Sequence, residues 1–263
     1  WNGDEWELKK IYFYTFCNQN HKAPYPASAV FSFNNGIVAI ASGSQITYLE
    51  NGEQKNIECI PASVNAIWGT SSKDFYVVGN NGNIAHYDGS PSGTGWKKIE
   101  SGTTLPIRDL FGARDNRSGE YEILCAADSY GSLEGSKVLS IKNNIVRELW
   151  NDGRPFGLDA IWFVPGRRYI VVGDGLWEAR SPEGSWVLSS NLPMLHKTSI
   201  DANGLNDIFV CGAFWLLAHN NGVSWQTYFP FASGSFTAVV LKGNMVIAVG
   251  GADNKALVLI GRR

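Results

Sequence analysis

Short runs of β-branched and aromatic residues alternate along the chain with Gly, Asn, Asp and Ser. The clearest stretch extends from Val64 to Ile99 and contains four such runs in a row. Each run is about four to eight residues long and ends at turn-forming residues, which is typical of β-strands joined by tight turns. The pattern predicts four consecutive strands, which we name a, b, c and d in chain order.

The same order of runs recurs along the whole sequence. Strand a is expected at 29–33, 65–69, 108–112, 159–164, 198–202 and 237–241. Strand b ends each time on a small residue, which lets neighbouring backbones approach closely; these are Ser42, Gly79, Ala127, Gly173, Gly212 and Gly250. Six repeats in 263 residues give about 44 residues each, close to the ~40–50 of a propeller blade.

These repeats predict an all-β fold, a six-bladed β-propeller of four-stranded antiparallel blades. We expect a single domain over 1–263 with blades at 27–60, 63–101, 106–150, 157–190, 196–229 and 235–261. The last repeat lacks strand d, and residues 1–8 match that strand, with Trp6 in its tryptophan position. The N-terminal segment is therefore expected to be the outermost strand of the last blade, which would remove an open sheet edge. An open β-solenoid is the alternative architecture, and residues 9–26 are interpreted as a long connection.

Composition narrows the class of protein. Hydrophobic residues make up 44% and charged residues 17% of the chain, and the net charge is -2. The first two values argue against disorder, and the scattered Lys and Arg argue against nucleic-acid binding. No apolar run approaches the ~20 residues of a membrane span. Because the sequence begins at Trp1, we expect a mature form or a part of a larger chain.

The four cysteines do not form a metal-binding or CxxC pattern. Cys125 and Cys211 lie inside apolar runs and are expected to be small buried hydrophobes. Cys17 and Cys59 flank one repeat, and they are expected to pair only if the protein is exported. We expect no metal and no cofactor.

One blade carries a family resemblance. The segment 68–89 resembles repeats of exported bacterial propellers, similar to photosystem-II-assembly-factor-like propellers and to the sialidase-type (BNR, Asp-box) repeat group. Residues 220–225 look like a degenerate Asp-box, with Ala218 and Asn220 in place of its Ser and Asp. The resemblance implies an extracytoplasmic location, in the periplasm or at the cell surface and with a lipid anchor in some members. The Asp-box is a turn motif and not a catalytic motif. The resemblance therefore supports the predicted fold but does not indicate a chemical reaction.

Aligning the six predicted inner strands gives two layers of side chains, one polar and one apolar. The polar layer, at the start of strand a, consists of Ser28, Asn65, Arg108, Asp159, Thr198 and Thr237. The apolar layer, two residues later, consists of Val30, Ile67, Leu110, Ile161, Ile200 and Val239. Strand a lines the channel of a propeller, so Asn65, Arg108, Asp159, Thr198 and Thr237 are candidate ligand-binding residues at one mouth. The alternative is that strand starts are simply wetter.

Two tryptophans follow strand b in neighbouring repeats. Trp177 and Trp215 lie in or just after the b–c connection. At a rim they would stack on a sugar or anchor a protein partner. The alternative is that both pack between blades.

No catalytic motif stands out in the sequence. A glycosidase needs two carboxylates ~5–9.5 Å apart, and Arg108, Asp109 and Asp159 are the candidates near inner-strand starts. His86 and His219 occupy matching positions in separate blades, and His196 begins an inner strand. The first hypothesis is a non-catalytic binding or scaffold module for a protein or glycan, acting through the face with the b–c loops. A carbohydrate-active hydrolase or lyase at the channel mouth and a structural spacer domain are the alternatives.

Overall fold

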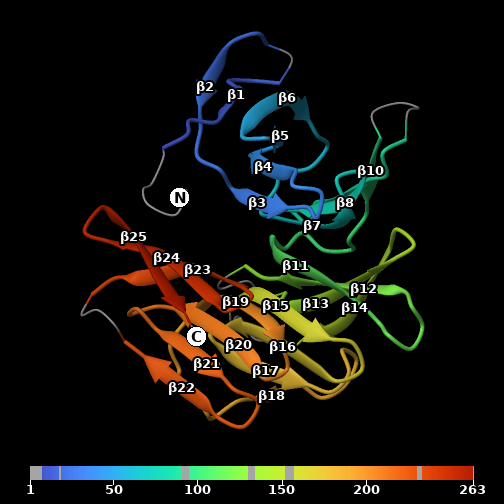
Figure 1. Ribbon diagram of the computed structural model, residues 1–263. Helices are drawn as coiled ribbons and strands as arrows, with labels where there is room; N and C mark the ends of the chain where they lie inside the picture. The colour runs from blue at the N-terminus through green and yellow to red at the C-terminus, as the bar shows by residue number, and fades with distance from the viewer. Residues whose placement is uncertain are drawn as a thin grey trace. The chain divides into compact units, whose positions relative to one another are not determined.

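The computed structural model describes residues 8–17, 19–90, 95–129, 134–151, 157–229 and 233–262 (Figure 1). The chain divides into two compact units, Trp1–Glu100 and Ser101–Arg263. Within the described ranges both units consist of strands and turns without a helix. Every strand pair is antiparallel, as expected for consecutive strands joined by short turns.

The first unit contains a hairpin and two four-stranded sheets. The hairpin is formed by β1 (Tyr12–Tyr14) and β2 (Lys22–Pro24). The first sheet is β3 (Ala29–Ser32), β4 (Val38–Ser42), β5 (Gln45–Glu50) and β6 (Glu53–Cys59). The second is β7 (Ala66–Ser71), β8 (Asp74–Val78), β9 (Ile84–Tyr87) and β10 (Trp96–Ile99).

The second unit contains four sheets in chain order. The third sheet is β11 (Ile107–Arg114), β12 (Tyr121–Ala127), β13 (Lys137–Lys142) and β14 (Ile145–Asn151). The fourth is β15 (Leu158–Val164), β16 (Arg168–Gly173), β17 (Gly175–Ala179) and β18 (Val187–Leu188). The fifth is β19 (Lys197–Gly204), β20 (Asp207–Gly212), β21 (Leu217–Asn220) and β22 (Trp225–Tyr228). The sixth is β23 (Ser235–Lys242), β24 (Met245–Ala252) and β25 (Lys255–Arg262).

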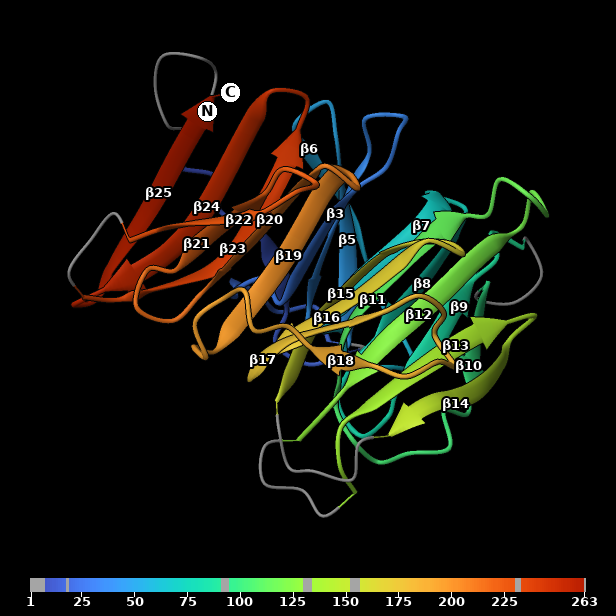
Figure 2. The ribbon, with the colours of Figure 1, turned by 90° about the horizontal axis from the view of Figure 1, so that it is seen from below.

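Six successive antiparallel sheets are the blades of a β-propeller, which confirms the predicted fold class. Five have four strands, and the sixth has three among the described residues. The strand predicted to complete it falls on residues 1–7, which lie outside the described residues, while Leu8 is in no strand. In the second unit the first strands β11, β15, β19 and β23 lie side by side (Figures 1 and 2).

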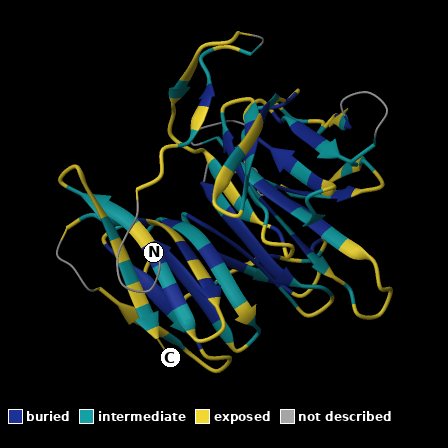
Figure 3. Cartoon of the chain, turned by 45° about the horizontal axis from the view of Figure 1, so that its top comes forward, coloured by how far each residue is buried: buried dark blue, intermediate teal, exposed yellow. Residues whose placement is uncertain are grey.

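The residues of the predicted apolar layer contribute to the hydrophobic cores of the two units. Five of its six residues are buried, and Ile161 and Ile200 each belong to a separate cluster in the second unit. Along part of β23 buried and exposed residues alternate (Figure 3), because successive side chains point to opposite faces of a sheet. Val30 is the exception at 61% exposure, so the prediction of an apolar layer buried in all six blades is wrong there.

The first sheet explains that exception. Val30 shares its face with Ile40 and Ile57, which pack against Phe13 of the β1–β2 hairpin. The hairpin covers part of this face and leaves Val30 on β3 in solvent. The segment 9–26, interpreted as a long connection, contains a two-stranded hairpin that buries one aromatic ring completely, which was not predicted.

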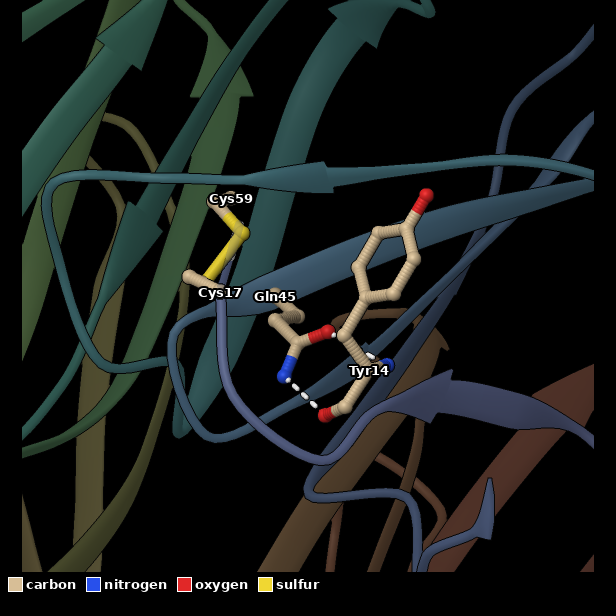
Figure 4. Close-up of a disulfide and its surroundings, with 4 residues drawn as sticks. All are labelled: Tyr14, Cys17, Gln45 and Cys59. Atoms are coloured by element: carbon tan, nitrogen blue, oxygen red, sulfur yellow. Dashed lines mark hydrogen bonds between the residues drawn. A yellow bond between two sulfur atoms is a disulfide. The ribbon is translucent and has the colours of Figure 1, made fainter. Parts of the chain in front are cut away.

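Two glutamine side chains hold β1 in place. The Gln45 amide receives the Tyr14 backbone N–H at 2.9 Å and donates to the Tyr14 carbonyl at 2.8 Å. Gln54 does the same with Tyr12, at 3.0 and 2.6 Å. Each amide thus pairs with the backbone as a neighbouring strand would. Beside them Cys17 and Cys59 form a disulfide with their Cα atoms 5.8 Å apart (Figure 4).

Close packing of the backbone explains why strand b ends on a small residue. A Cβ on Gly173, Gly212 or Gly250 would overlap the backbone carbonyl oxygen of the residue that enters its own sheet. Those carbonyls belong to Gly157, His196 and Ser235, respectively. The inner end of strand b therefore lies against the incoming chain, and this contact brings residues at the strand-a start close to the b–c turn.

Candidate functional site

Antiparallel connectivity places the b–c turns and the d–a connections at the same end of each sheet, and we name it the b–c end. The a–b and c–d turns lie at the other end. In the second unit the b–c end brings together Arg108, Asp128, Asp159, Asp174 and His196. They come from three consecutive sheets, so no single stretch of sequence contains the group.

His196 lies between two carboxylates. Its Nε2 is 2.5 Å from Asp159 Oδ2, and its Nδ1 is 2.6 Å from Asp174 Oδ1. The Asp159 hydrogen bond is the main cause that raises the pKa of His196 to about 9, against the opposing effect of burial. At neutral pH the ring is therefore an imidazolium that donates to both carboxylates and links the fourth sheet to the fifth.

Arg108 and Asp128 flank this triad. The Arg108 Nε donates to the Asp128 backbone carbonyl at 3.3 Å, and the Asp128 carboxylate accepts the Ser136 hydroxyl at 2.8 Å. Burial raises the pKa of Asp128, although the Ser136 hydrogen bond and Arg108 oppose the shift. Gly157 lies between the His196 ring and the Asp128 carboxylate. The group is thus a dense set of charges that largely satisfy each other.

Asp109 has a structural use that was not expected. Its Oδ2 accepts the backbone N–H of Ile161 at 3.0 Å, which fastens β11 to β15. Burial raises its pKa to about 7 despite that hydrogen bond. Ser199 and Asp201 accept the backbone N–H groups of Val239 and Leu241 in the same way, at 3.2 and 2.7 Å. These acceptors compensate for the gap between inner strands of neighbouring sheets.

Lys197 supports the loop that carries His196. Its side chain is buried, and Nζ donates to the carbonyls of Pro193 and Leu195 at 2.9 and 2.8 Å. Desolvation lowers its pKa to about 8. A buried ammonium ion that closes this loop holds His196 at the end of β19.

The remaining polar-layer residues form hydrogen bonds within the fold. Thr198 donates its hydroxyl to the Phe236 carbonyl at 2.9 Å, and Thr237 donates to the Val249 carbonyl at 3.2 Å. In the first unit Asn65 donates to the Asn80 side chain at 3.0 Å. The structure thus brings Arg108 and Asp159 into the charged group and uses the two threonines to connect backbones.

The two candidate tryptophans pack in the interior. Trp177 is 8% exposed and its ring centroid lies 5.9 Å from that of Trp150. Trp215 is 1% exposed, packs on Phe236 and donates its indole N–H to the Ser233 carbonyl. The structure therefore favours packing between strands over an exposed aromatic pair at the rim.

The exposed aromatic residue is instead the neighbour, Phe214, at 64% exposure. Phe214 and Trp215 have φ values of 56° and 58°, and the Leu216 N–H donates to the Ala213 carbonyl at 3.1 Å. This is a two-residue turn with both central residues in the left-handed region, where Asn and Gly are favoured and bulky residues are strained. Burial of Trp215 holds the turn and leaves Phe214 at its tip.

The matching histidines have separate partners. His86 Nε2 is 2.8 Å from Asp74 Oδ1 in the first unit, and His219 Nε2 is 3.1 Å from Asp207 Oδ1 in the second. Each ring stacks on an aromatic residue of strand b. Among the described residues no group of three His, Cys, Asp or Glu side chains is arranged to hold a metal ion. No helix long and apolar enough to cross a membrane occurs in this part of the chain.

The sequence analysis did not identify Asp174, and of the neighbouring Phe214 and Trp215 it selected Trp215. Asp174 follows the small residue of strand b, and Phe214 follows Gly212-Ala213, where other repeats have Asn, Asp or Gly. The signal that could have found Phe214 was a bulky residue at a turn position. Asp174 had no local signal, because its partner His196 is 22 residues away.

No protein-family model matches the chain, and no curated protein is similar to it in sequence. Solved structures match it as folds. The structure of YCF48 bound to D1 peptide is 17% identical with a TM-score of 0.65, covering 93% of this chain and 79% of that one. A streptogramin B lyase is 12% identical with a TM-score of 0.65, and the match covers 88% of this chain and 82% of the lyase chain. The calcium-binding protein regucalcin from Agrobacterium tumefaciens str. C58 is 12% identical with a TM-score of 0.61, and the match covers 87% of this chain and 83% of the regucalcin chain. At these identities the likeness establishes the β-propeller fold alone.

Proposed function

We propose that this propeller is a non-catalytic binding module that recognises a segment of a protein partner at the b–c end of its second unit. Phe214 is the apolar anchor, and the charged group around His196 supplies the polar contacts. The observation that carries the proposal is the strained turn that presents Phe214 to solvent.

The strained backbone of this turn supports a binding role for the exposed Phe214 ring. A non-glycine residue in the left-handed region costs about 1–2 kcal/mol, and such residues cluster at binding sites and active sites. The corresponding turn of the sixth sheet uses Asp253 and Asn254, with φ values of 49° and 60°, where short polar side chains tolerate this conformation. The fifth sheet has the same backbone with a phenylalanine at the tip.

The chemistry of the charged group supports binding over catalysis. Both imidazole nitrogens of His196 are engaged by carboxylates, and Asp109 is bonded to the Ile161 backbone. The proposed hydrolase alternative with Arg108, Asp109 and Asp159 therefore lacks a free pair of carboxylates. A rigid, internally paired set of charges is instead suited to orienting a partner.

A protein partner is favoured over a glycan by two features. Phe214 and Met194 are both large, apolar and more than half exposed, and aromatic residues and Met are enriched in protein interfaces. The YCF48 structure, a similar fold, contains a bound peptide. We take this as support for a peptide or an extended loop as the ligand.

Peptides selected from a displayed random library against the intact chain would test the proposal. Their affinities are then measured for wild type, for Phe214→Asn and for Val223→Asn. Val223 is 92% exposed in the c–d turn of the same sheet, at the opposite end. Phe214→Asn should weaken binding at least about tenfold, as expected for loss of an aromatic anchor, and Val223→Asn should not. Equal affinities for wild type and Phe214→Asn would contradict the proposal.

We also propose an extracytoplasmic location. The disulfide between Cys17 and Cys59 supports it, because such bonds persist mainly in oxidising compartments. Alkylation of the denatured, unreduced protein taken from its native source should modify two of the four cysteines, Cys125 and Cys211. Modification of all four would overturn this proposal.

A further inference from the structure

A cavity of about 720 Å³ opens at the end of the second unit away from the b–c turns. Its walls come from the a–b and c–d turns of the fourth and fifth sheets, with Arg167, Arg168, Arg180, Ser181 and Asn206 among the lining residues. This volume lies within the ~300–1,000 Å³ range of small-molecule sites. The cavity shares no lining residue with the charged group around His196.

The cavity carries surplus positive charge. Three arginines line it, and Glu178 is the one acidic side chain among its described lining residues. Arg168 bonds Glu178 at 2.9 Å and Asn220 at 3.3 Å. Within the described part of the chain, Arg167 and Arg180 have neither a hydrogen bond nor an ion pair from their side chains. Two guanidinium groups are therefore available to a ligand.

The remaining lining completes a site for an anionic ester. Ser181 and Ser185 bring hydroxyl groups, and Asn206 brings an amide, all of which can donate to oxygen. Val187 and Leu205 provide an apolar wall on which an organic group can lie. Guanidinium groups match tetrahedral oxyanions because two parallel N–H groups bond two oxygens.

We propose that this cavity binds a phosphate monoester. A net charge of two positive units, from three arginines and one glutamate, balances a phosphate monoester that carries nearly two negative charges at neutral pH. A sulfate monoester has the same shape with one negative charge. The phosphate chemistry is shared by phosphorylated sugars and phosphorylated peptides, and the pocket volume accepts either head group.

Calorimetric titration of the whole chain at pH 7.5 and low salt tests this site. The probes are phenyl phosphate, phenyl sulfate, glucose 6-phosphate and a short phosphoserine peptide. Phenyl phosphate should bind at least tenfold more tightly than phenyl sulfate. Whichever of the last two probes binds more tightly identifies the source of the phosphate, and both outcomes support the site.

The matched variants are the double change Arg167→Gln and Arg180→Gln, and the control Arg262→Gln. Arg262 is an exposed arginine on β25 that does not line the cavity. The double variant should lose at least tenfold in affinity for phenyl phosphate, and the control should stay within twofold. Absence of binding by every probe, equal affinity for phosphate and sulfate, or an unchanged double variant would overturn the proposal. Phe214→Asn should leave phosphate binding unchanged, so this test and that of the peptide site fail separately.

Discussion

The two ends of the second unit handle charge in opposite ways. At the b–c end His196 is enclosed by Asp159 and Asp174, Arg108 bonds a backbone carbonyl, and Asp109 bonds a backbone N–H. At the other end Arg167 and Arg180 line a cavity without partners among the described residues. The paired charges Arg108, Asp109 and Asp159 lie on strands, whereas the unpaired Arg167 and Arg180 lie in turns.

The difference lies in whether the charged side chains at each end are paired within the protein. Charges that satisfy each other fix the positions of loops and couple neighbouring sheets, and such a paired set can orient a partner without taking up a free ion. Charges left unpaired on turns remain available for an anion. Substitutions at the b–c end and one at the opposite end should therefore differ in their effects on stability and on its pH dependence.

Close backbone contact should make the b–c end intolerant of small changes. Gly212→Ala places a Cβ against the His196 carbonyl and is expected to destabilise the fold by roughly 3 kcal/mol. Gly204→Ala, at the opposite end of the same sheet, has nothing within 4 Å and should be neutral or stabilising by up to about 1 kcal/mol. Urea denaturation measures both, and equal losses at the two positions would remove the contrast.

Removing the imidazolium should destabilise the b–c end next most strongly. His196→Gln leaves Asp159 and Asp174 without their shared cation, and we expect a loss of roughly 1–2 kcal/mol at pH 7, reduced by solvent screening at this partly exposed site. The folded-state pKa is raised to about 9, so the stabilisation is complete below the unfolded value and is lost as pH rises through 9. The variant should show a flatter stability profile between pH 6.5 and 9. A profile identical to wild type would show that the triad does not couple the sheets.

Ionisation of Asp109 should add a second pH dependence at the same end. Its pKa is raised to about 7, so the folded state prefers the protonated form, and stability falls as pH rises above the unfolded pKa. The penalty grows until pH passes the folded pKa. Between pH 6 and 8 we expect a loss of about 1.4 kcal/mol, which Asp109→Asn should abolish. Chemical denaturation at the two pH values checks it, and an unchanged pH dependence in the variant would contradict the assignment.

The smallest effect should be a gain in stability. Phe214→Asn relieves a left-handed backbone at an exposed position, so the free energy of unfolding should rise by about 0.5–1 kcal/mol. Thermal denaturation measures the gain. A loss of stability would mean that the Phe214 ring packs in the native state and is not held ready for a partner.

The repeat pattern predicted much of the fold because each blade is a local unit. Turn residues and β-branched runs lie within about 40 residues of one another, and hydrogen bonding between consecutive strands follows from that spacing. The hairpin over β1 and β2 escaped prediction because its partners, Gln45 and Gln54, are 31 and 42 residues away. The burial of Cys125 and Cys211 was predicted and is confirmed.

Only part of the candidate site could be predicted from the sequence. Arg108 and Asp159 were selected from one aligned column and do lie in the charged group, whereas Thr198 and Thr237 of that column bond backbone carbonyls. Trp177 and Trp215 were correctly placed next to the b–c turns but pack inside. Their inward orientation depends on neighbouring sheets, which a single repeat does not contain.

The all-β class, the six repeats and the small residues that let strand b approach the incoming chain were predictable from the sequence. These are properties of local spacing and side-chain size. The tertiary structure places His196 between Asp159 and Asp174, exposes Phe214 rather than Trp215, and brings Arg180 of the c–d turn to the cavity that Arg167 and Arg168 also line. Each of these arrangements depends on packing between segments that are separated in the sequence, so the local pattern of residues does not contain it.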